Sequence, residues 1–225
     1  MKYISVAVDG PAGAGKSSVS KAVAKSLGYT YIDTGAMYRA VALFAINNGI
    51  DAKNETEKLV SHLNEVEIDI KYTDDGQQIY LLGENVSKRI REEDVSVGAS
   101  NVAVIPEVRK KLVELQRKMA ESANVIMDGR DICSYVLPNA DVKIFLTASA
   151  ESRAKRRYDE LCEKGIECDF EKIKADMEYR DKNDSQRAVA PLKKADDATL
   201  IDTTEYDFYG AVKIVKDLIL EKTEG

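Results

Sequence analysis

The feature of this sequence that most constrains its fold is the run Gly10-Pro11-Ala12-Gly13-Ala14-Gly15-Lys16-Ser17, which matches the pattern G-x-x-x-x-G-K-[ST] in full. In such a P-loop the backbone N–H groups turn inward around phosphate oxygens, the lysine reaches the β and γ phosphates, and the serine hydroxyl ligates Mg²⁺. The mechanism requires a strand before the loop and a helix after it. Here the β-branched run Tyr3 to Val8 precedes the loop, and Val19, Val23 and Leu27 follow at four-residue spacing. The sequence therefore predicts a strand–loop–helix unit that binds a nucleoside triphosphate.

Strand and helix patterns alternate along much of the remaining chain. Candidate strands lie at Tyr3–Val8, Tyr29–Ile32, Asn124–Met127, Val142–Leu146 and Thr199–Ile201, and helix patterns lie at Met37–Ile46, Pro106–Met119 and Phe208–Ile219. Strands that alternate with helices are typical of a parallel sheet with helices on its faces. We therefore predict an α/β fold with a five-stranded parallel sheet flanked by helices.

Two stretches interrupt this alternation. Residues Glu65 to Val86 alternate in polarity around Asp74-Asp75-Gly76, which predicts a small antiparallel insert of two or three strands. Residues Ala150 to Arg187 are highly charged and helical, with Ser149 as the predicted N-cap, and are expected to form a mobile lid. The predicted division is a core of about 1–62, 96–149 and 188–225, an insert of about 63–95, and a lid with its following helix of about 150–187.

Charge and residue counts exclude several classes of function. The formal net charge of -6 argues against non-specific binding to nucleic acid polymers, which depends on cations that meet phosphates. Three cysteines, Cys133, Cys162 and Cys168, show no Cys-x-x-Cys pairing, so they predict free thiols rather than a disulfide framework or a zinc site. The single histidine, His62, excludes a histidine-based metal cluster.

The start of the chain bears on its location. The apolar stretch before Asp9 is too short for a secretory signal and far too short to cross a membrane. We therefore expect a cytoplasmic protein with no membrane partner. A monomer is expected, because one core can bury all the amphipathic faces.

Polar residues follow two of the candidate strands, where ligands bind in open α/β sheets. One cluster runs from Asp33 to Arg39, and the other is Asp128-Gly129-Arg130-Asp131. Asp33 and Asp128 are candidate ligands of Mg²⁺, directly or through water, although either is alternatively an exposed turn residue. Arg39 and Arg130 are candidates for charge-assisted hydrogen bonds to the phosphate of an acceptor molecule.

Five of the eleven arginines lie within 35 residues: Arg153, Arg156, Arg157, Arg180 and Arg187. The first three are spaced i, i+3 and i+4, which predicts one helix face suited to closing over the phosphates of ATP. Arg180, Asp184 and Arg187 are spaced i, i+4 and i+7, which again predicts one face if the helix extends that far. Ordinary solvated helix faces are the alternative interpretation.

Five motifs give the chain its resemblance to the bacterial cytidylate kinases: Asp9–Ser17, Tyr31–Arg39, Asp128–Asp131, Lys143–Ser149 and Arg187–Leu192. They span nearly the whole chain in the expected order. The resemblance implies a nucleoside monophosphate kinase fold with a core, a monophosphate-binding insert and an arginine-bearing lid. It also implies that ATP and CMP or dCMP are the substrates, and that the γ-phosphoryl group is transferred with Mg²⁺ to give CDP or dCDP and ADP.

The resemblance, together with the P-loop, implies roles for matching residues. Residues expected to bind ATP are Gly10, Pro11, Ala12, Gly13, Ala14, Gly15, Lys16, Ser17, Ser18, Arg156 and Arg157. Those expected to bind CMP are Thr34, Tyr38, Arg39, Ser100, Arg109, Arg130, Asp131, Arg180, Asp184 and Arg187. Lys16, Arg130, Arg153 and Arg157 are expected to act in catalysis, and Ser17, Asp33 and Asp128 to hold the metal.

The chain departs from the family pattern at Cys133, where the family usually has glycine, and this departure puts the backbone beside the cytosine site in question. Two alternative functions remain open. One is a P-loop switch protein that binds GTP, although the chain lacks the Asn-Lys-x-Asp guanine signature. The other is a kinase for a different acceptor, such as UMP, AMP or an alcohol.

Overall fold

The computed structural model describes residues 3–73, 76–187 and 189–224. Asp74, Asp75 and Ala188, which fall within the predicted insert turn and the last family motif, lie outside the described residues. The chain forms two compact units. Residues 1–30 and 122–225 make up the P-loop unit, and residues 31–121 make up the α2 unit.

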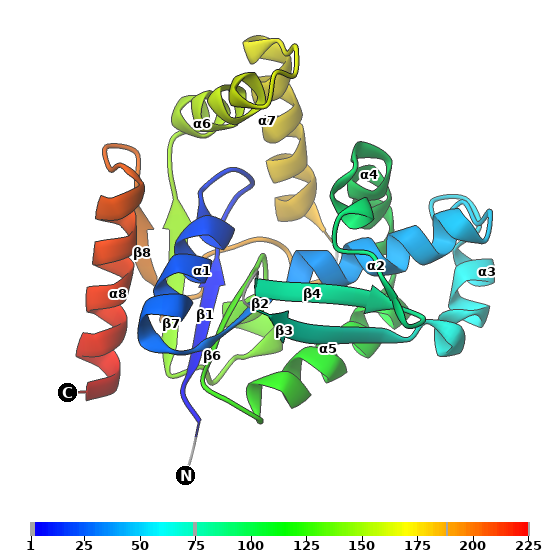
Figure 1. The fold of residues 1–225 in the computed structure, drawn as a ribbon, viewed down its shortest axis with the longest axis horizontal. Helices are drawn as coiled ribbons and strands as arrows, with labels where there is room; N and C mark the ends of the chain where they lie inside the picture. The colour runs from blue at the N-terminus through cyan, green and yellow to red at the C-terminus, as the bar shows by residue number, and fades with distance from the viewer. Residues whose placement is uncertain (1–2, 74–75, 188, 225) are drawn as a thin grey trace. The chain divides into compact units, whose positions relative to one another are not determined.

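Five strands form the main sheet, in the order β2-β6-β1-β7-β8 (Figure 1). Their bounds are β1 Ser5–Asp9, β2 Thr30–Asp33, β6 Val125–Gly129, β7 Val142–Thr147 and β8 Thr199–Asp202. Strand β1 pairs in parallel with β6 and β7, and β7 pairs in parallel with β8. The predicted five-stranded parallel α/β fold is confirmed. Since parallel strands end at the same edge, the P-loop after β1 emerges beside the residues that follow β6.

The helices of the P-loop unit are α1 Lys16–Leu27, α6 Ala150–Glu163, α7 Phe170–Gln186 and α8 Phe208–Glu224. Gly28 ends α1 in a left-handed conformation, and its N–H donates to Ala24 O. The side chain of Ser149 accepts a hydrogen bond from the N–H of Ser152, which confirms it as the N-cap of α6. The charged stretch predicted as a helical lid therefore consists of two helices joined by a short turn.

The α2 unit contains α2 Thr34–Asn47, α3 Thr56–Ser61, α4 Glu93–Val102 and α5 Pro106–Ala120, with β3 Ile68–Thr73, β4 Gly76–Leu81 and β5 Glu84–Asn85. The three strands form an antiparallel sheet, as the alternating pattern predicts. Helices α3 and α4 are not predicted from the sequence. In α4 only Val95 and Val102 are buried, so the apolar repeat is weak, and Gly98 brings the helix close to Ala42 of α2.

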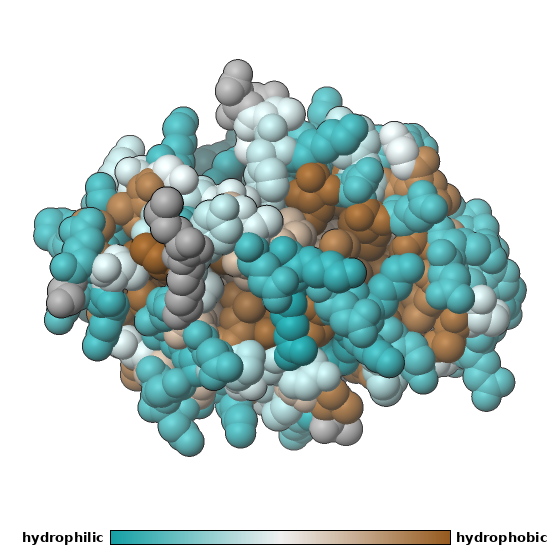
Figure 2. All heavy atoms as spheres, turned by 90° about the horizontal axis from the view of Figure 1, so that it is seen from below, coloured by the Kyte–Doolittle hydropathy of each residue, from teal (hydrophilic) through white to brown (hydrophobic). Residues whose placement is uncertain are grey.

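Hydrophilic side chains cover most of the face seen in Figure 2, with smaller hydrophobic areas between them. Among the described residues, no helix combines the length and apolar character needed to cross a membrane.

A substitution at Gly10 would test how closely the P-loop approaches β7. A Cβ atom added at Gly10 would lie 1.9 Å from the carbonyl oxygen of Leu146, whereas one added at Gly28 would have no heavy atom within 4 Å. Both glycines have positive φ, of 151° and 68°. We expect Gly28→Ala to lower the free energy of unfolding by about 1–2 kcal/mol through strain alone. Gly10→Ala should cost at least twice as much, because a backbone clash adds to the strain. Urea denaturation of both variants measures the difference, and equal losses would contradict the close approach.

Candidate active site

The P-loop has the backbone form that phosphate binding requires. Gly13 and Gly15 adopt positive φ of 72° and 81°, and Gly15 is the N-cap of α1, which begins at Lys16. The first N–H groups of a helix have no partners within the helix, and the helix dipole places partial positive charge there. The loop and the start of α1 therefore present donors to an anion at the end of β1.

Lys16 is the cation of this loop, and its pKa is strongly shifted. Its ammonium Nζ donates to the carbonyl oxygen of Pro11 at 2.7 Å, and only 5% of the residue is exposed. Burial, and after it the charge of Arg130, lowers the pKa of Lys16 to about 7, against smaller opposing effects of Asp128, Asp9 and Asp184. The protein's own carboxylates thus fall short of stabilising the charged lysine. A polyphosphate beside Nζ would supply the missing negative charge.

Ser17 and Asp128 lie together at the helix start. The Ser17 hydroxyl donates to Asp128 Oδ2 at 2.7 Å, and Asp128 is 4% exposed near the end of β6, level with Val8 of β1. Hydroxyl and carboxylate oxygens are ligands that Mg²⁺ accepts. No group of three or more His, Cys, Asp or Glu side chains suited to a metal occurs in the described ranges. The pair therefore fits a cation that takes its remaining ligands from phosphate and water.

Asp9 holds the loop after β6, a role that sequence reasoning missed. Its carboxylate is fully buried and accepts the N–H groups of Ile132 and Cys133, each at 2.8 Å. Desolvation raises the pKa of Asp9, and the two N–H bonds offset part of that effect. The two bonds fix the residues that directly follow Asp131. A carboxylate at the end of an otherwise apolar strand was the available signal.

The structure answers the question raised by Cys133. It lies in a π-helical turn, Ile132–Val136, and is not among the described non-glycine residues with positive φ. The thiol is buried and donates weakly to the carbonyl oxygens of Ala7 and Ile144, at 3.5 and 3.6 Å. The backbone at this position therefore has no need of glycine, and the side chain packs against β1 and β7.

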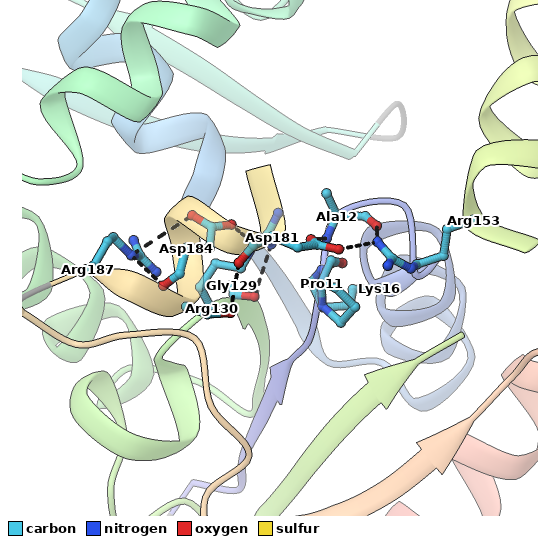
Figure 3. A network of polar contacts seen from close by, with 10 residues as sticks. Pro11, Ala12, Lys16, Gly129, Arg130, Arg153, Asp181, Asp184 and Arg187 are labelled. Atoms are coloured by element: carbon cyan, nitrogen blue, oxygen red, sulfur yellow. Dashed lines mark hydrogen bonds and ion pairs between the residues drawn. The ribbon is translucent and has the colours of Figure 1, made fainter. Parts of the chain in front are cut away.

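The three predicted arginines all lie on α6, but their guanidinium groups contact different acceptors. Arg153 is 6% exposed, and its guanidinium donates to Ala12 O at 2.7 Å and pairs with Asp181 of α7 at 2.6 Å (Figure 3). Arg156 instead donates to the hydroxyl and carbonyl oxygens of Thr203, at 3.2 and 2.6 Å. Arg157 is exposed and pairs with Glu160 on its own helix at 2.8 Å. The guanidinium groups therefore point to different acceptors, and their closing over the phosphates of ATP stays a prediction.

Two carboxylates of α7 organise the polar network in Figure 3. Asp181 accepts the N–H of Ala12 at 3.0 Å while it pairs with Arg153, so it links α7 to the P-loop. Asp184 pairs with Arg130 Nε at 2.8 Å, and its backbone oxygen accepts Arg187 Nε at 3.2 Å. Asp184 and Arg187 are thus brought together as predicted, while Arg180 is exposed. Asp181 was missed, although it lies one helical turn before Asp184.

The α2 unit holds the first acceptor cluster. Asp33 is the N-cap of α2 and accepts the N–H of Ala36 at 2.9 Å. Its other oxygen pairs with Arg39 and with Arg91, each at 3.1 Å. Thr34 is buried in the first turn of α2. The oxygens of Asp33 are therefore engaged in capping and in orienting Arg39, a different use from the predicted metal ligation.

The other predicted residues of the α2 unit lie on α2, α4 and α5. Arg109 is 1% exposed, donates to Ala103 O at 3.2 Å, and lies 5.8 Å from the ring centre of Tyr38. Ser100 is exposed on α4. Burying a guanidinium costs free energy, and the hydrogen bond to Ala103 O and the contact with the Tyr38 ring offset part of that cost. The same two contacts orient the Arg109 side chain.

Comparison with known proteins identifies the family. The sequence pattern described as cytidylate kinase matches residues 6–222. The chain belongs to the cytidylate kinase family. A relative named cytidylate kinase from Anoxybacillus flavithermus is 49% identical over 224 residues, which cover 100% of this chain and 99% of the relative. Another of that name from Caldicellulosiruptor saccharolyticus is 50% identical over 97% of this chain and 96% of the relative.

A solved structure of an uncharacterized protein from Eubacterium ventriosum is similar with a TM-score of 0.50 at 16% identity, over 99% of both chains. This likeness concerns the fold alone. The cytidylate kinase family membership rests on the sequence match, which includes the P-loop and the Asp128–Asp131 segment.

The lowered pKa of Lys16 predicts a pH effect on stability without nucleotide. Between pH 7 and 10.5 the unfolded chain keeps a proton on this lysine that the folded chain has lost, so the free energy of unfolding rises with pH through this group. We expect the wild type to gain stability relative to Lys16→Met as the pH is raised from about 7 to about 10. Urea denaturation at several pH values measures the gap. Lys25→Met, at an exposed position of the same helix, should show no comparable change, and a constant gap for Lys16→Met would contradict the lowered pKa.

Proposed function

We propose that this protein transfers the γ-phosphoryl group of ATP to CMP or dCMP, which yields ADP and CDP or dCDP. The observation that carries the proposal is the family match over residues 6–222. The P-loop agrees with it, because Lys16 is buried with too little negative charge around it to keep its usual pKa. Phosphoryl transfer of this kind is achieved mainly by positioning and by neutralising charge, with no covalent intermediate on the enzyme.

On the donor side, the N–H groups of the P-loop and of the first turn of α1 bind the phosphates of ATP. Lys16 leaves the carbonyl of Pro11 and pairs with the β and γ phosphates, which raises its pKa and restores its charge. Ser17 and Asp128 are the proposed protein ligands of Mg²⁺, which would neutralise phosphate charge when bound. Asp33 is left out of this set because two arginines and a helix N-terminus engage its carboxylate.

On the acceptor side, the P-loop unit contributes Arg130, which Asp184 holds through Nε. Arg130 Nη1 also donates to Gly129 O at 3.2 Å, and the remaining N–H groups of the guanidinium are proposed to bind the phosphate of CMP. Asp131 is buried at the start of the turn that Asp9 secures, and it is proposed to read the cytosine. Arg180, Asp184 and Arg187 are proposed to contact the ribose and phosphate.

The α2 unit contributes a second set of acceptor residues: Thr34, Tyr38, Arg39, Ser100 and Arg109. Asp33 orients Arg39 for the acceptor phosphate, and Tyr38 supports Arg109, which is proposed to read the cytosine edge with Ser100. An acceptor phosphate is already an anion, so no general base is needed to activate it.

The three arginines of α6 have different partners before ATP binds. Arg153 already lies against the P-loop, whereas Arg156 and Arg157 must first leave Thr203 and Glu160 to reach ATP. Such a rearrangement would exclude water from the γ-phosphate and limit wasteful hydrolysis. We place this activity in the pyrimidine nucleotide metabolism of the cytoplasm, where its substrates occur, and propose a monomer.

The acceptor is tested by incubating the protein with ATP and Mg²⁺ and, separately, CMP, dCMP, UMP, AMP or GMP, while ADP release is followed. We expect CMP or dCMP to give the highest kcat/KM, because the proposed cytosine contacts pair poorly with other bases. Omitting Mg²⁺ should abolish transfer. Faster turnover of UMP or AMP would exclude the cytosine assignment while leaving a P-loop kinase in place.

Arg130→Lys tests the guanidinium fork at the acceptor phosphate. The variant keeps the charge but loses bidentate hydrogen bonding, so we expect kcat/KM for CMP to fall by roughly tenfold or more. Arg89→Lys is the matched control, since Arg89 pairs with Asp94 on the exposed surface of the α2 unit. Steady-state kinetics with varied CMP measure both. Kinetics of Arg130→Lys that match those of the control would remove Arg130 from the acceptor site.

A further inference from the structure

The turn between α6 and α7 brings two cysteines together. Helix α6 ends in a Schellman motif, in which Gly165 N–H donates to Cys162 O at 2.9 Å and Ile166 N–H donates to Leu161 O at 3.0 Å. Gly165 has a φ of 69°, which reverses the chain direction. The chain then returns along the end of α6, so that Cys168, just before the N-cap Asp169 of α7, lies beside Cys162.

The two sulfur atoms, Sγ of Cys162 and Sγ of Cys168, are 4.0 Å apart, and both thiols are free. Cys162 is exposed and Cys168 is partly buried. Edge-to-face packing of Tyr158 on Phe170, with ring centres 6.1 Å apart, holds the two helices together beside the pair. A closure of about 2 Å would bring the sulfurs to bonding distance.

We propose that Cys162 and Cys168 form a reversible, redox-responsive disulfide across the α6–α7 turn. The inference is independent of the proposed kinase activity, because it rests on the turn and the two thiols alone. Metal binding is the weaker use of this pair, since a structural zinc site takes four ligands and no group of three suitable side chains occurs in the described part of the chain.

The oxidant that we assign to the site is a low-molecular-weight disulfide such as oxidised glutathione. The Cys162 thiolate attacks one glutathione sulfur, which forms a mixed disulfide and releases one glutathione thiolate that takes up a proton. The Cys168 thiolate then attacks the Cys162 sulfur, forms the protein disulfide and releases the second glutathione. Overall, two protein thiols are oxidised and one glutathione disulfide is reduced to two thiols.

The difference in environment sets the order of attack. Cys162 is the accessible thiol, whereas partial burial and the neighbouring Cys162 raise the pKa of Cys168. Cys168 therefore acts as the resolving thiol. Reduction by excess glutathione runs the same steps backward, as expected for a disulfide that forms only transiently in a reducing compartment.

Cys133 provides an internal control. It is 1% exposed, and burial together with the Asp9 carboxylate raises its pKa. A buried thiol of raised pKa is a poor nucleophile, so Cys133 should stay reduced while the pair oxidises.

The test incubates the folded full-length chain in glutathione buffers of increasing oxidised fraction, alkylates the remaining thiols, and maps proteolytic peptides by mass spectrometry. We expect an intramolecular cross-link between the Cys162 and Cys168 peptides, with loss of two hydrogens, that dithiothreitol reverses. Cys168→Ser should accumulate one glutathionyl group on Cys162, because the mixed disulfide has no resolving thiol. Cys133→Ser should behave as the wild type does.

Three results would overturn the proposal. One is stable glutathionylation of Cys162 in the wild type with no cross-link. The second is a cross-link that appears only after the chain is denatured. The third is disulfide-linked dimers as the main product in dilute protein.

Discussion

The burial of the Lys16 ammonium is the constraint around which the charged groups of the P-loop unit are arranged. Burial of a cation costs free energy unless anions or hydrogen-bond acceptors compensate it. The protein gives Lys16 one carbonyl contact and three carboxylates at longer range, which leave its pKa near 7. These contacts compensate the charge of Lys16 only in part, and the phosphates of a bound nucleotide would supply the remaining negative charge. The free protein is therefore poised to bind a polyanion.

Carboxylates position the groups around this lysine. Asp9 ties the end of β1 to the residues after β6, and Asp181 ties α7 to the P-loop and to Arg153. Asp184 holds Arg130 by one edge of its guanidinium. Charge-assisted bonds of this kind are directional as well as strong, so they fix where each cation points. Asp181 and Asp184 therefore hold Arg153 and Arg130 in fixed orientations before a phosphate binds.

Much of the fold follows from local patterns in the sequence. Each strand of the main sheet lies within two residues of its predicted range, because a continuous apolar run bounded by polar residues is a strong signal. The weak repeat of α4 carries no such signal. Its helix is stabilised by packing on α2, where Gly98 allows close approach to Ala42. The arginines of α6 show the same limit, since spacing places Arg153, Arg156 and Arg157 on a helix but leaves open which acceptor each one meets.

The sequence by itself determined the phosphate-binding loop, the parallel α/β architecture, the small antiparallel insert and the family, because each is encoded in contiguous residues or in their order. Only the tertiary structure decided the partners of the charged side chains. It assigned Asp33 to a helix cap and two arginines, made Asp181 a link to the P-loop, and brought Cys162 within 4.0 Å of Cys168. The reason is physical: a backbone motif is set by the residues that form it, whereas an ion pair or a thiol pair depends on groups that the chain fold brings together.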